Sequence, residues 1–233
     1  MADDRGLDGF DPYDLQDVES ERIGAWFDHL DDDGLQVASA CEGWTRRDLL
    51  GHLVAVEDYH RACLEGTVSE LIEPYLSRGA TSLDEINQAA VDDLAQIGAA
   101  DLLTTWRDRN QHSRAGFRAA DGTNIDTSIG SYPGRYQAFH VASELGIHAD
   151  DAGAPVDEAE RAERERWLAG VARFALTEVR EDASVEPTDD GYRVSRGGTE
   201  MTFDTGAFVA GMFGRAAPGQ LTSAGSELLS LSD

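Results

Sequence analysis

The sequence contains no lysine, so its 19 basic residues are all arginine, and they are outnumbered by 45 acidic residues. The formal net charge at pH 7 is −26. Such a field repels nucleic-acid phosphates and anionic lipid headgroups, because binding to either relies on clustered positive charge. We therefore expect neither nucleic acid nor a membrane surface as a partner.

Long apolar segments and cysteine frameworks are also missing. No run of about 18 apolar residues occurs, so we expect no membrane-spanning helix. The first residues, MADDRGLDG, lack the apolar core of a signal peptide. Two cysteines, Cys41 and Cys63, make no disulfide framework, and no glycine-rich nucleotide loop or G-x-S-x-G nucleophile elbow is found. We expect a cytoplasmic protein.

Apolar residues make up 41% of the chain, which is enough for one large domain or a main domain with a small appendage. Their spacing predicts helices over residues 12–30, 45–65, 68–76, 82–97, 101–120, 136–152 and 157–179. The Asp31–Gly34 run should end the first helix, and residues 123–133 should form a long polar loop, a candidate lid. We expect the tail to contain strands at 192–194 and 200–203, a helix at 206–213 and a final apolar stretch at 227–231.

Residues 136–153, YQAFHVASELGIHADDAG, place three polar side chains at helical spacing. His140, Glu144 and His148 are each four residues apart, so their Cβ atoms should be roughly 5–6 Å apart on one helix face. Apolar neighbours indicate that this face points inward, where a carboxylate beside an imidazole is costly unless it is paired or bound to a metal. Spacing alone does not distinguish the pair His140 and Glu144 from the pair Glu144 and His148.

A second helix offers another imidazole. Thr45 and Asp48 form a capping box at its start, and His52 falls on its apolar stripe. His60 and Cys63 lie about 12 and 16 Å farther along the axis at ~1.5 Å per residue, so we do not expect either to share a metal with His52. Two histidines and one glutamate with an open fourth position are typical of a catalytic zinc site.

Two stretches, WTRRDLLGHL at residues 44–53 and ELGIHADD at residues 144–151, resemble the DinB-like superfamily and, within it, the mycothiol-dependent maleylpyruvate isomerase family. The resemblance implies a mainly α fold: a DinB-like four-helix bundle, expected over residues 1–153, followed over residues 154–233 by a linking helix and a shortened, small α/β C-terminal domain. It also implies that His52, Glu144 and His148 hold a divalent metal, zinc or alternatively nickel or another ion. The arginine-only composition fits an actinobacterial source, whereas the acidic charge would equally fit a halophile.

The activity that the resemblance implies is isomerase or S-transferase chemistry with mycothiol, a low-molecular-weight thiol, as cosubstrate. The partner would be a small electrophile, which could be a carboxylate, and Arg215 takes the place of a tail arginine thought to reach the active site. A guanidinium binds a carboxylate through two parallel hydrogen bonds. Two other classes stay open, namely a metal-dependent hydrolase and a non-catalytic binding or stress protein. We expect a monomer or a homodimer.

Three further residues lie near the predicted ligands. Cys41 precedes the Trp44 motif and could approach the site as a free thiol. Asp150 and Asp151 lie near the C-terminus of the predicted helix that contains Glu144, where the helix dipole disfavours carboxylates. One of them could orient a metal-bound imidazole, although this acidic chain has aspartates throughout.

Overall fold

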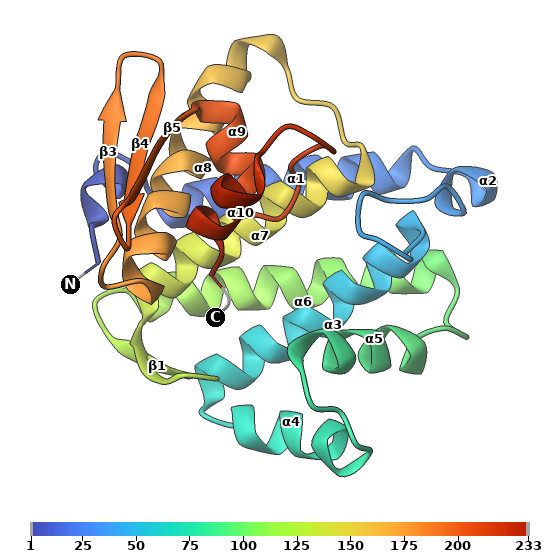
Figure 1. Cartoon of the computed structure of the whole chain (residues 1–233). Coiled ribbons are helices and arrows are strands. Elements are labelled where there is room, and N and C mark those ends of the chain that lie inside the picture. Colours follow the sequence, from blue (N-terminus) through green and yellow to red (C-terminus); the bar gives the residue numbers. More distant parts are fainter. Residues whose placement is uncertain (1, 232–233) are drawn as a thin grey trace. The chain divides into compact units, whose positions relative to one another are not determined.

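The computed structural model describes residues 2–231 (Figure 1). It contains two compact units, one formed by Asp11–Pro155 and the other by Met1–Phe10 together with Val156–Asp233. No described helix is both long enough and apolar enough to cross a membrane.

The larger unit is a helical bundle. In chain order it contains α1 (Pro12–Asp28), α2 (Asp32–Leu35), α3 (Arg46–Glu65), α4 (Val68–Ser77), α5 (Leu83–Asp93), α6 (Ala99–Ala119), β1 (Asn124–Thr127), β2 (Gly130–Pro133) and α7 (Gly134–Ala152). The long helices α1, α3, α6 and α7 form the bundle, in which α3 packs on α6 and α1 packs on α7. The predicted mainly α fold with a four-helix bundle is confirmed.

Local signals in the sequence explain where the long helices begin and end. Asp11 caps α1 by accepting hydrogen bonds from the backbone of Tyr13 and the following residue, and proline occupies the first helical position. Thr45 and Asp48 form the predicted reciprocal capping box of α3. Gly66 ends α3 in the left-handed conformation, with φ of 72°. These contacts fix the register of α3, and hence the face on which its histidines lie.

Two local predictions were wrong. The Asp31–Gly34 run does not end the first helix, which stops at Asp28. Instead, the Asp31 side chain accepts a hydrogen bond from the Gly34 N–H at 2.8 Å and so caps a separate short helix, α2. The helix predicted for residues 82–97 ends at Asp93, because the last turn changes to isolated turn hydrogen bonds.

The predicted polar loop at residues 123–133 is also wrong, because these residues form the antiparallel hairpin β1–β2. Ile125 pairs with Tyr132, and both side chains are buried. Gly130 has φ of 99°, which glycine adopts without strain, and the Thr127 hydroxyl donates to its carbonyl at 2.8 Å. The alternate residues of this segment are buried against α3, so the segment is an ordered edge of the bundle.

The smaller unit combines helices with one sheet. It contains η1 (Asp4–Leu7), α8 (Glu158–Val179), β3 (Ser184–Thr188), β4 (Gly191–Arg196), β5 (Thr199–Asp204), α9 (Thr205–Met212) and α10 (Ser223–Leu229). The strands are antiparallel in the order β3-β4-β5. The two predicted strands and the predicted helix are confirmed, whereas β3 was missed. Leu176, Val194 and Phe208 are fully buried in the core of this unit.

Candidate metal centre

Helices α3 and α7 bring the three predicted ligands together. One possible ligand atom from each of His52, Glu144 and His148 lies within 4.8 Å of the others. His52 Nε2 is 3.2 Å from His148 Nε2 and 3.9 Å from Glu144 Oε1. His52 is buried, whereas Glu144 and His148 are partly exposed. The cluster is therefore anchored in the bundle and open on one side.

His140, the alternative left open by the spacing, has a different environment. Its Nε2 lies 3.1 Å from the hydroxyl of Tyr132, which belongs to the hairpin strand β2. Among the described residues, His140 is in neither of the groups of side chains that could share a metal. The geometry therefore favours Glu144 and His148 as the pair on α7.

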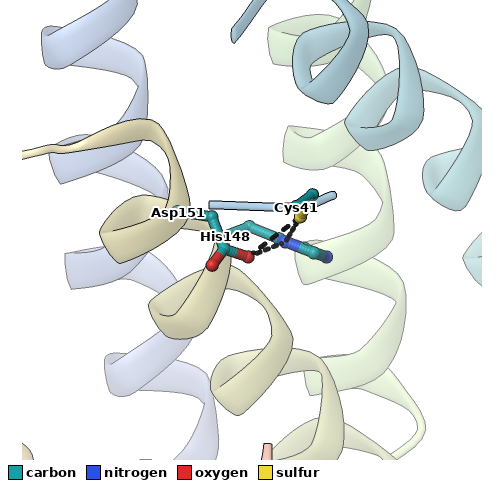
Figure 2. Close-up of side chains that lie close together, drawn as sticks. All are labelled: Cys41, His148 and Asp151. Atoms are coloured by element: carbon teal, nitrogen blue, oxygen red, sulfur yellow. Dashed lines mark hydrogen bonds and ion pairs between the residues drawn. The ribbon is translucent and has the colours of Figure 1, made fainter. Parts of the chain in front are cut away.

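The other ring nitrogen of His148 faces a buried carboxylate (Figure 2). His148 Nδ1 lies 2.9 Å from Asp151 Oδ2, and the thiol of Cys41 lies 3.2 Å from the same oxygen and 4.0 Å from Nδ1. If Nδ1 carries the proton and donates it to Asp151, the lone pair of Nε2 points toward His52 and Glu144. Cys41, His148 and Asp151 also form a second group whose atoms could share an ion.

A buried network that the sequence did not reveal contacts Glu144 from the opposite side. Glu57 and His60 on α3 are each 2% exposed, and His60 Nδ1 lies 3.2 Å from Glu57 Oε2. Asn110 from α6 donates to the other oxygen of Glu57 at 2.8 Å. His60 Nε2 is 3.6 Å from Glu144 Oε2, so it forms an ion pair with a candidate ligand. Glu57 and His60 are three residues apart on the inward face of the helix, and this spacing could have predicted that the two side chains interact.

The electrostatic environment of Glu144 and His52 favours the deprotonated form of each side chain, which is the form that binds a metal. Burial raises the pKa of Glu144, but the ion pair with His60 and the charges of the other neighbouring histidines outweigh it and lower this pKa to about 2. Burial and the adjacent His148 lower the pKa of His52 to about 4. At neutral pH Glu144 is therefore a carboxylate and His52 a neutral imidazole.

His148 has the opposite shift. Burial alone would lower its pKa, but hydrogen bonds to Asp151 and Cys41 together with the charge of Glu144 raise it to about 9. Two Nε2 atoms only 3.2 Å apart repel each other unless a proton or a cation lies between them. His52 Nδ1 is buried without a hydrogen-bond partner. Two nitrogens and one carboxylate oxygen in this arrangement fit a divalent ion such as zinc or nickel.

The remaining predicted site residue, Arg215, belongs to the smaller unit. It follows α9, and its Nη1 donates to the carbonyl of Phe213 at 3.1 Å. Its role at the site stays a prediction.

Comparison with known proteins places these features in a family. The family model of the mycothiol maleylpyruvate isomerase N-terminal domain matches residues 17–153 of this sequence. Two solved structures, the mycothiol-dependent maleylpyruvate isomerase and a mutant of it, are each 15% identical to this chain, with a TM-score of 0.61 and 92% of both chains covered. This likeness shows a shared fold. No curated protein sequence matches the chain. Because the family model spans more than half of the sequence, the chain belongs to the mycothiol maleylpyruvate isomerase family.

Proposed function

We propose that this chain is a divalent-metal-dependent enzyme that uses mycothiol as cosubstrate in an isomerase or S-transferase reaction on a small electrophile. The observation that carries the proposal is the convergence of His52, Glu144 and His148 within 4.8 Å, in a chain that belongs to this family. His52 from α3 and two side chains from α7 are the proposed metal ligands. Zinc is the proposed ion, with nickel or another divalent metal as the alternative.

The bound ion would supply a Lewis acid that favours the thiolate form of a thiol at its open position. The protein supplies the orientation of the ligands. Asp151 accepts from His148 Nδ1 and so directs Nε2 into the cluster, and His60 holds Glu144 Oε2 so that Oε1 faces His52. The Trp44 ring, centred 5.0 Å from the His52 ring, covers that imidazole.

The two proposed reactions share their first bond-forming step. The thiolate sulfur forms a bond to an activated carbon of the electrophile. In isomerisation the sulfur adds to a double bond conjugated to a carbonyl group, and the π electrons move onto the carbonyl oxygen to give an enolate. Rotation about the new single bond follows. Return of the electron pair then breaks the carbon–sulfur bond, which gives the isomer and returns the thiolate. If the electrophile carries a leaving group, that group departs with the bonding electrons and the product keeps the thiol, which is S-transfer.

Loss of bound metal tests the ligand assignment. We expect His52→Ala, Glu144→Ala and His148→Ala each to lose metal, measured by elemental analysis of the purified protein, and to lose thiol-dependent turnover. His140→Ala is the matched control and should keep both. Metal loss in His140→Ala but not in His148→Ala would show that the ligand pair lies one helical turn away. Turnover that needs metal but no thiol would instead support a hydrolase.

Arg215 is the proposed binding group for a substrate carboxylate. Lysine cannot reproduce the two parallel hydrogen bonds of a guanidinium, so Arg215→Lys should keep its metal but lose most turnover of a carboxylate substrate. Arg166→Lys, at an exposed arginine of the same unit, is the control. Normal turnover by Arg215→Lys would assign this arginine a structural role only.

A further inference from the structure

A cavity of about 360 Å³ lies beside the candidate metal ligands, within the larger unit. His52 and Glu144 line one part of it, and α3, α4 and α5 provide most of its walls. These walls are mainly aliphatic and aromatic, and include Tyr59, Leu71, Ile72, Leu83, Ile86 and Leu94. Apolar walls with a few polar groups at one end are typical of a site for a small organic molecule.

The charged side chains of this cavity are all acidic. Besides Glu144 they are Asp58 and Asp93. Arg109 pairs with Asp58 at 2.6 Å, and Arg78 binds both oxygens of Asp93 at 2.8 and 2.9 Å. Among the described residues that line the cavity, none is an arginine. Arg109 and Arg78 are therefore committed to Asp58 and Asp93. A carboxylate placed against the walls away from the metal ligands would find no uncommitted cation in the described lining.

From this lining we infer that the electrophile has an uncharged, apolar body, about the size of an aromatic ring, which binds in this cavity beside His52 and Glu144. This inference rests on the proposed function and specifies its substrate class. Any carboxylate of the substrate would lie outside the cavity. The contact with Glu144 and His52 places the apolar body next to the point where the thiol would react.

A simple neutral probe for this reaction is 1-chloro-2,4-dinitrobenzene. The thiolate sulfur forms a bond to the ring carbon that carries chlorine, the carbon–chlorine bond breaks, and chloride leaves with the bonding electrons. The proton of the thiol passes to solvent, so no oxidant or reductant is required. Release of chloride therefore reports S-transfer directly.

Leu83 offers a substitution that should not disturb the fold. It lines the cavity but is 70% exposed, and it is the first residue of α5, where an acidic side chain suits the helix dipole. Leu83→Asp should raise the KM for the neutral probe about tenfold, the lower end of the discrimination that one methylene in an apolar pocket provides. Ile129→Asp is the matched control, because Ile129 is 79% exposed and does not line the cavity. Its KM should be unchanged.

Binding without thiol separates this inference from the proposed function. Saturation-transfer NMR on the metal-loaded full chain should detect the neutral probe bound to the wild type and to Ile129→Asp, and more weakly to Leu83→Asp. Binding with this pattern but no thiol-dependent chloride release would overturn the S-transferase form of the proposed function and would support the preference of the cavity for a neutral ligand. Equal binding by Leu83→Asp and the wild type would overturn the inference. The inference would also be overturned if maleate, a small dicarboxylate, displaced the neutral probe from the cavity in the same NMR experiment.

Discussion

Replacing Asp151 by asparagine tests whether a buried carboxylate prepares His148 to bind metal. Asp151 is 4% exposed, and its Oδ2 is 2.9 Å from His148 Nδ1. The substitution keeps the shape of the side chain and removes its charge. The asparagine can still present an oxygen to Nδ1, but it stabilises the polarised imidazole less, because hydrogen bonds to an ionised acceptor are stronger than those to a neutral one.

The expected loss is in metal affinity. Partners that orient a ligating histidine typically contribute about 10- to 100-fold to affinity. This corresponds to ~1.4–2.8 kcal/mol, since tenfold is ~1.4 kcal/mol. The dissociation constant for zinc, measured by competition with a chromophoric chelator, should rise within that range for Asp151→Asn. Asp150→Asn is the control, because Asp150 is the exposed neighbour on the same helix.

A second substitution separates orientation from direct ligation. In Cys41→Ser the hydroxyl can still donate to Asp151, as the thiol does at 3.2 Å. If Cys41 only supports Asp151, this variant should bind zinc with nearly wild-type affinity. A large loss in Cys41→Ser would indicate that the thiol itself ligates the ion. Unchanged affinity in Asp151→Asn would refute the orienting role of the carboxylate.

Two further predictions concern the smaller unit and the buried thiol. The hydrogen bond from Arg5 and the charge of Arg173 hold the pKa of Asp3 well below its usual value of 3.8, so its stabilisation is present above that pH and is lost as the pH falls below it. Asp3→Asn should therefore lower the free energy of unfolding in urea by ~1–3 kcal/mol at pH 7, and the deficit should shrink in acid. A deficit that is independent of pH would contradict this assignment. Cys63 is 1% exposed and burial raises its pKa to about 11, so native Cys41→Ser should resist iodoacetamide at pH 8, as followed by mass spectrometry, until denaturant is added.

The sequence was informative where the structure depends on contacts within one helix. The capping box at Thr45 and the glycine stop at Gly66 are local hydrogen-bonding patterns, and both define α3 as predicted. The four-residue interval between Glu144 and His148 is likewise a property of one helix. Such features need no knowledge of the rest of the chain. The four-helix bundle and the set of His52, Glu144 and His148, which involve two helices, were anticipated only from the family resemblance.

Strands were harder to predict, because their partners lie elsewhere in the chain. Residues 124–133 are mostly polar, so the sequence alone did not predict a strand there. The strands are stabilised by the pairing of Ile125 with Tyr132 and by the burial of that face against α3. The strand β3 contains Pro187, and proline is disfavoured in a central strand. It is tolerated here because β3 lies at the edge of the sheet, where it pairs with β4. In both segments the deciding interaction is tertiary.

The role of His60 at the candidate site was also not predictable from the sequence, because it depends on a contact between two helices. The rise of a helix gives the distance between His52 and His60 along α3, but it does not show where a side chain from α7 will lie. In the structure Glu144 lies between the two imidazoles, with Oε1 3.9 Å from His52 Nε2 and Oε2 3.6 Å from His60 Nε2. One carboxylate thus connects the candidate metal cluster to the buried pair of His60 and Glu57. A residue too distant to be a ligand of the same ion therefore still contributes to the site, because it fixes which oxygen of Glu144 faces the other ligands.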